Sequence, residues 1–67
     1  MVDHSTITTA DKLACVQREL AMRRNVYPKW VASGRMKQMA ADKEIAVMEA
    51  ILADIRAKDA LEKSSIY

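Results

Sequence analysis

The chain has 67 residues, a formal net charge of +2 and a single cysteine. This length allows one domain, and so short a chain buries only about 60% of its unfolded surface, which makes a lone monomer marginally stable. One cysteine (Cys15) and one histidine (His4) exclude an intrachain disulfide and give no structural zinc site without distant carboxylates. Self-association or unusually good helix packing remains as the source of stability.

The N-terminal part of the sequence predicts a tail followed by a helix. Residues 1–7 are expected to be disordered, and they lack the basic and apolar regions of a signal peptide. Thr8 and Asp11 have the spacing of a capping box, with Asp in place of the usual Glu. A stripe of residues spaced alternately three and four positions apart then predicts an α-helix. Arg23 is the charged residue of this seam; its apolar residues are Leu13, Val16, Leu20, Tyr27 and Trp30, and Val31 makes the stripe wider.

Pro28 leaves two interpretations for the end of this helix. It has no N–H, and its ring opposes the carbonyl of Arg24. The helix either ends at Tyr27 or is kinked at Pro28 and continues to Ser33, with Gly34 as a left-handed C-terminal cap. We favour the second interpretation, a helix at about 9–33, because the apolar spacing passes through Pro28 unbroken.

The second predicted helix spans about 38–62, a segment without Gly or Pro and rich in Ala, Glu, Lys and Met. Lys37 precedes it and cannot cap its N-terminus as Ser, Thr, Asp or Asn would. Residues 64–67 are expected to form a loose tail. Apolar residues occupy roughly 160° of this helix on a helical wheel, wider than one antiparallel neighbour covers. We therefore expect a second neighbour from another chain, with Val47, Ile51 and Ile55 at the dimer interface.

The predicted fold is all-α: an antiparallel two-helix hairpin over residues 8–63, which dimerises into a four-helix bundle. Its expected core consists of Leu13, Val16, Leu20, Tyr27, Trp30, Val31, Ile45, Met48, Leu52 and Ile55. Arg23 lies in the seam near Glu19, one turn back, and antiparallel pairing brings it close to Glu44. A structural role for Arg23 is favoured over contact with a ligand, and Cys15 is expected to be a small buried residue.

Composition and spacing argue against an enzyme. Cys15 has no evident base, the carboxylates scatter along the solvent side of the second helix, and a two-helix hairpin offers no deep pocket. No cofactor, metal or small-molecule substrate is expected. No apolar run approaches the roughly 20 residues that cross a bilayer, so the expected location is the cytoplasm.

Basic residues gather around the turn between the two helices. Residues 18–37 contain six Lys and Arg and one Glu. The expected contact surface for a protein partner consists of Arg24, Lys29, Arg35, Met36 and Lys37. A basic patch with interleaved Tyr27 and Trp30 also keeps a second interpretation open, a small nucleic-acid-binding accessory factor.

Three short motifs carry a resemblance to a known group of proteins: Cys-x-x-Arg-Glu from Cys15, Val-Tyr-Pro-x-Trp-Val from Val26 and Glu-Ile-x-x-Met-Glu-Ala from Glu44. With them, about residues 15–55 resemble small proteins encoded by bacteriophages and prophages of proteobacteria. The resemblance carries no established activity. It implies an accessory protein that binds a host or phage protein as an inhibitor or adaptor, and it supports no catalytic residue.

Overall fold

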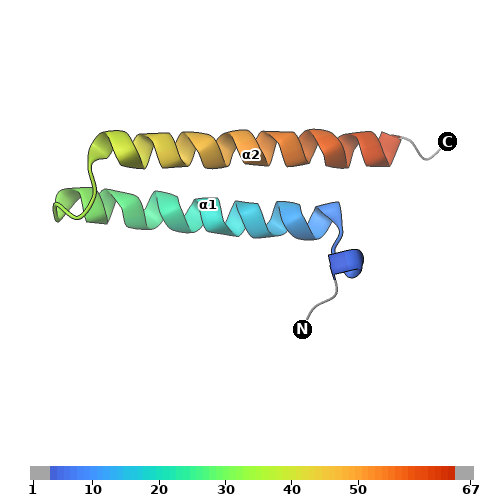
Figure 1. The fold of residues 1–67 in the computed structure, drawn as a ribbon, viewed down its shortest axis with the longest axis horizontal. Coiled ribbons are helices and arrows are strands. Elements are labelled where there is room, and N and C mark those ends of the chain that lie inside the picture. The colour runs from blue at the N-terminus through green and yellow to red at the C-terminus, as the bar shows by residue number, and fades with distance from the viewer. Residues whose placement is uncertain (1–3, 65–67) are drawn as a thin grey trace.

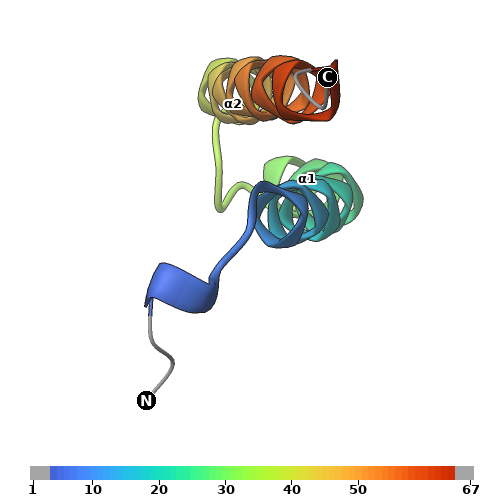
Figure 2. The same ribbon diagram turned by 90° about the vertical axis from the view of Figure 1, so that its right-hand side faces the viewer.

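The computed structural model describes residues 4–64, which form two long helices joined by a tight turn (Figure 1). Helix α1 spans Thr9–Ala32 and helix α2 spans Gln38–Ser64; a short 3-10 helix, η1, precedes them at His4–Thr6. The helices run antiparallel and side by side in both ribbon views (Figures 1 and 2), and no described residue belongs to a strand. The all-α prediction is confirmed.

The two ends of the chain differ in part from the expected tails. Residues 4–6, expected to be disordered, form η1, and the amide of Ile7 donates to the carbonyl of His4 at 3.2 Å. Ser64, expected in the C-terminal tail, is the last residue of α2. Residues 1–3 and 65–67 of the predicted tails lie outside the described residues.

A capping box begins α1, as the sequence predicts. The hydroxyl of Thr8 accepts a hydrogen bond from the Asp11 amide, and the Asp11 carboxylate accepts one from the Thr8 amide, both at 3.0 Å. Two otherwise unpaired amides are thereby satisfied. These interactions also lower the pKa of Asp11, because they stabilise its ionised carboxylate. The hydrogen bond from the Thr8 amide makes the largest contribution, and the Thr8 side chain makes the next largest.

Helix α1 passes through Pro28 and ends at Ala32, so the interpretation that continued the helix is correct; the kink stays a prediction. Gly34 has a φ of +80°, which residues with a Cβ rarely adopt. The amide of Arg35 donates to the carbonyl of Trp30 at 2.9 Å, and that of Gly34 donates to Val31 at 3.1 Å. This pair of bonds is a Schellman motif, and it turns the chain toward α2.

The fully buried core is small. Leu20, Ala41 and Leu52 expose 1%, 2% and 7% of their surface, and they are the only buried hydrophobic residues that the structure describes. Seven further predicted core residues are half-buried: Leu13, Val16, Tyr27, Val31, Ile45, Met48 and Ile55. Trp30 is 41% exposed, so its placement in the core is wrong. Two helices form a single seam, and a residue beside that seam is covered from one side only.

Two contacts between the helices fix their register. The Thr9 hydroxyl donates to the Glu62 carboxylate at 2.9 Å, and the Arg24 guanidinium bonds the Glu49 carboxylate at 2.7 Å. Residues 20 and 52 consequently lie at the same level along the hairpin. The expected approach of Arg23 to Glu44 across the seam is not found among the ion pairs of residues 4–64. Arg23 bonds the carboxylate of Glu19, 2.8 Å away on its own helix.

Candidate functional site

The structure divides the predicted contact surface into two parts. Arg35, Met36 and Lys37 lie in the turn, and Lys29 lies in the last turn of α1. The turn is held to the helix because the amides of Arg35 and Met36 both donate to the carbonyl of Trp30. Arg24 lies further back on α1, where Glu49 neutralises its charge. We call the first group, residues Lys29, Arg35, Met36 and Lys37, the basic end of the hairpin.

Three cations of the basic end are free to meet a partner. Lys29, Arg35 and Lys37 are exposed, and none of them forms an ion pair in the described part of the chain. Two apolar side chains of the same end of the hairpin reach solvent: Trp30 is 41% exposed and Met39 is 84% exposed. Positive charge beside exposed Trp and Met surface suits contact with a large, negatively charged partner.

Trp30 also borders a small hollow on α1. Its ring lies 5.7 Å from the ring of Tyr27, centroid to centroid, with 34° between the planes. The hollow, about 170 Å³ in volume, is lined by Met22, Arg23, Val26, Tyr27 and Trp30. Met22, Val26 and Trp30 follow one another at four-residue spacing and therefore lie along one side of α1.

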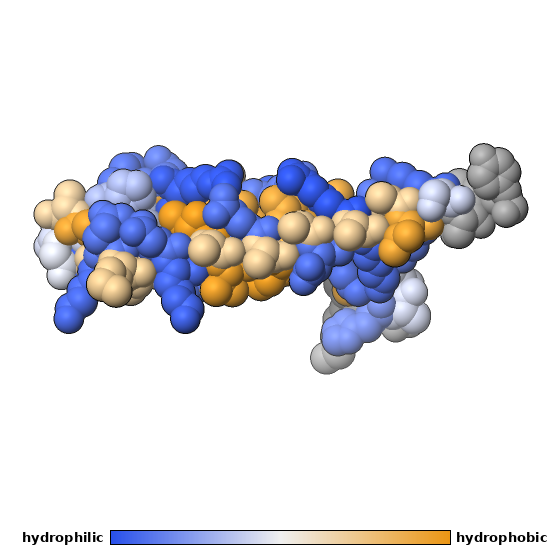
Figure 3. Space-filling model, turned by 90° about the horizontal axis from the view of Figure 1, so that it is seen from above, coloured by the Kyte–Doolittle hydropathy of each residue, from blue (hydrophilic) through white to orange (hydrophobic). Residues whose placement is uncertain are grey.

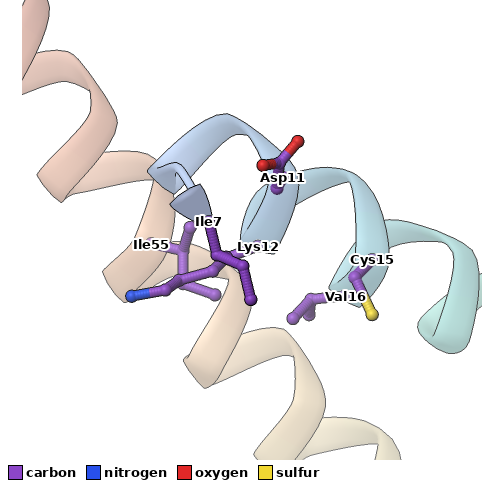
Figure 4. A pocket seen from close by; sticks show the side chains of 6 residues that line it. All are labelled: Ile7, Asp11, Lys12, Cys15, Val16 and Ile55. Atoms are coloured by element: carbon purple, nitrogen blue, oxygen red, sulfur yellow. The ribbon is translucent and has the colours of Figure 1, made fainter. Parts of the chain in front are cut away.

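A larger hollow, about 480 Å³ in volume, lies near the other end of the hairpin (Figure 4). Ile7, Lys12, Cys15, Val16 and Ile55 surround it, while the carboxylate of Asp11 points away from the others. Cys15 is exposed, so the prediction that it is buried is wrong. Its side chain lies on a flank of α1 that α2 does not cover.

The two hollows lie on the same side of the hairpin. Cys15 and Ile55 line the larger hollow together. Ile51 and Val47 precede Ile55 by one and two turns on α2, and Met22 follows Cys15 by two turns on α1. We call this surface the apolar face; it consists of Cys15, Met22, Val26, Trp30, Val47, Ile51 and Ile55.

Val47 and Ile51, predicted at a dimer interface, are 44% and 41% exposed, whereas Ile55 is half-buried. Figure 3 looks onto the side of α2 that is turned away from α1 and shows hydrophobic side chains in a band along it, between hydrophilic stretches. The predicted interface included only the α2 half of the apolar face. Cys15, Met22 and Val26 had the same helical spacing, but a sequence does not show that two flanks on different helices lie on one side.

The described residues show no arrangement typical of a metal site. Within residues 4–64, no group of three or more His, Cys, Asp and Glu side chains gathers closely enough to hold an ion. Neither described helix combines the length and the apolar composition needed to cross a bilayer.

Comparison with known proteins gives no match: no protein-family model, no curated protein and no solved structure is similar to this chain.

Proposed function

We propose that this chain is a non-enzymatic accessory protein that binds another protein through the basic end of the hairpin. The observation that carries the proposal is a group of three cations, Lys29, Arg35 and Lys37, that form no ion pair within residues 4–64 and lie near the exposed surface of Trp30 and Met39. The Schellman motif fixes the backbone of this turn, so a partner meets a preorganised surface and loses less free energy in ordering it.

The proposed context is a bacteriophage or prophage, and the proposed partner is a host or phage protein in the cytoplasm. This context depends on the resemblance of residues 15–55 to small phage and prophage proteins. The positive charge of the basic end favours a partner with an acidic patch, because complementary charge speeds association and excludes wrong partners.

A second candidate function is binding of nucleic acid by the same residues. The three cations of the basic end and a partly exposed Trp are also suited to a phosphate backbone and an unstacked base. Contacts to about three phosphates predict a slope near −2 to −3 for log affinity against log salt concentration. Protein binding is the leading proposal because so few cations give weak affinity for nucleic acid at physiological salt.

Affinity capture from a bacterial lysate tests the proposal when two variants of equal charge are compared. The first carries Lys29→Glu, Arg35→Glu and Lys37→Glu. The control carries Arg18→Glu, Lys43→Glu and Arg56→Glu, three exposed cations that have no ion pair among residues 4–64. Quantitative mass spectrometry is expected to find a protein that the native chain and the control both retain and the first variant loses.

Two results contradict the proposal. If the first variant retains every captured protein, the basic end is not the contact surface. If the native chain instead shifts the fluorescence anisotropy of single- or double-stranded DNA, and the shift falls steeply between about 50 and 200 mM salt, the second candidate function is correct.

A further inference from the structure

We propose that the apolar face binds a second copy of this chain, with a two-fold axis that crosses the helices at the level of Ala21 and Ile51. In this dimer the two hairpins stack face to face, and Ile51 meets Ile51 of the second copy. The dimer covers Trp30, which the surface proposed for a protein partner also uses, and it leaves the cations Lys29, Arg35 and Lys37 outside the apolar face.

The chain exposes more surface than a compact monomer of its mass. The chain exposes 5404 Å². A compact folded monomer of 7.5 kDa exposes about 4,250 Å². The difference, on the order of 1,000 Å², shows that two helices alone leave much of their surface to solvent.

The apolar face has the size that a stable dimer needs. Its shorter helix, α1, has 24 residues. That number of residues extends about 36 Å, and two adjacent helices are roughly 20 Å wide. Such a face measures about 700 Å² per chain, or about 1,400 Å² for the pair, within the range of specific interfaces. The face carries Met22, Trp30, Val47 and Ile51, each 41–50% exposed.

Charge complementarity selects the direction of the two-fold axis. Two hairpins stacked face to face can be related by a two-fold axis that runs across the helices or by one that runs along them. The first axis places each helix against the same helix of the second copy, and the second axis places α1 against α2. With the axis across them at Ile51, Glu44 lies level with Lys58 of the second copy, because each is seven residues from Ile51. Neither Glu44 nor Lys58 has an ion-pair partner within the described chain. Two new ion pairs therefore form, one on each side of the axis.

The same axis also suits the charges of α1. The register places Ala21 level with Ile51, as the contacts of Thr9 with Glu62 and Arg24 with Glu49 require. Glu19 and Arg23 each lie two residues from Ala21, on opposite sides of it, so Glu19 lies level with Arg23 of the second copy. Lys12 lies level with the exposed ring of Trp30 of the second copy, where a cation and an aromatic face attract each other.

An axis along the helices gives a poorer match. It places α1 beside α2 of the second copy at the same level, so Lys58 comes to the region of Lys12 and Cys15. Glu44 then lies at the level of Pro28 and Lys29, and it no longer lies level with Lys58 of the second copy. The loss of the two Glu44–Lys58 pairs and the approach of Lys58 to Lys12 disfavour this arrangement.

Cysteine cross-linking tests the position of the axis. The variant Cys15→Ser/Ile51→Cys has its only cysteine on the axis, and it is expected to form a disulfide-linked dimer under mild oxidation. The control Cys15→Ser/Val47→Cys has its two cysteines about 12 Å apart along the helices, beyond the roughly 7 Å between Cα atoms that a disulfide spans. Equal cross-linking of the two variants, or none with Ile51→Cys, overturns the proposed axis.

A charge swap tests the ion pairs by sedimentation equilibrium. Glu44→Lys and Lys58→Glu are each expected to weaken dimerisation roughly tenfold, because two attractive pairs become repulsive, and the double variant is expected to restore it. The matched control is Asp42→Lys/Arg56→Glu, which alters two exposed charges of α2 that lie level with alanines of the second copy and leaves dimerisation unchanged. A helical but monomeric native chain, or a double variant as weak as the single ones, overturns the proposal.

Discussion

Leu20→Ala is the substitution with the clearest expected effect on stability. Leu20 exposes 1% of its surface, and it is the largest side chain that is fully buried among residues 4–64. Truncation of a buried Leu to Ala costs about 2–5 kcal/mol in free energy of unfolding, since it removes apolar contact and leaves a cavity. We expect about 3 kcal/mol here. A folded chain of this size has a total of roughly 3–10 kcal/mol, so the loss is a third or more of the whole.

The measurement is urea unfolding followed by the far-ultraviolet circular dichroism of the helices. Leu61→Ala is the matched control, because Leu61 exposes 68% of its surface and Ala is the better helix former. The control is expected to change the free energy of unfolding by less than about 0.5 kcal/mol. Both variants and the native chain are compared at one protein concentration, since association raises apparent stability.

A small difference between these two variants contradicts the structure. If Leu20→Ala and Leu61→Ala unfold at the same urea concentration, Leu20 does not occupy a buried seam between α1 and α2. The register derived from Thr9–Glu62 and Arg24–Glu49 is then also wrong, because it places Leu20 level with Leu52.

Three further predictions concern the ends of the helices. Gly34→Ala is expected to cost about 1 kcal/mol in chemical denaturation, and an unchanged stability refutes this prediction. Apart from Gly34 and its two chain neighbours, no described residue has an atom within 4 Å of the added Cβ, so the cost comes from the φ of +80°. Lys37→Ser is expected to stabilise the chain by roughly 0.5–1 kcal/mol, because it supplies the missing cap of α2, and a lower melting temperature than that of the native chain is the contrary result. The pKa of Asp11 is lower in the folded chain than its ordinary value of 3.8. The stability that Asp11 contributes is therefore complete above that pH and is lost as the pH falls through the folded pKa. The measurement is the free energy of unfolding of the native chain and of Asp11→Asn at several pH values. The native chain is expected to be the more stable of the two near neutral pH and to lose this extra stability in acid. A difference in stability that does not depend on pH contradicts the capping role.

The sequence predicted the individual residues of the candidate site better than their grouping. Arg35, Met36 and Lys37 are neighbours in the chain and remain neighbours in the turn. Arg24 was assigned to the same surface, but the structure pairs it with Glu49, a residue 25 positions away. That pairing depends on how one helix is rotated and shifted against the other, which the spacing within a helix does not specify.

Local interactions let the sequence by itself determine both helices and the two ends of α1. The capping box at Thr8, the continuation through Pro28 and the left-handed cap at Gly34 all depend on residues within about five positions of one another. Tertiary structure alone decided which side of each helix is covered. It buried Ala41, left Trp30 and Cys15 exposed, and joined flanks of α1 and α2 into one apolar face. The physical reason is that burial depends on neighbours distant in sequence, and a hairpin of two helices covers only one side of each.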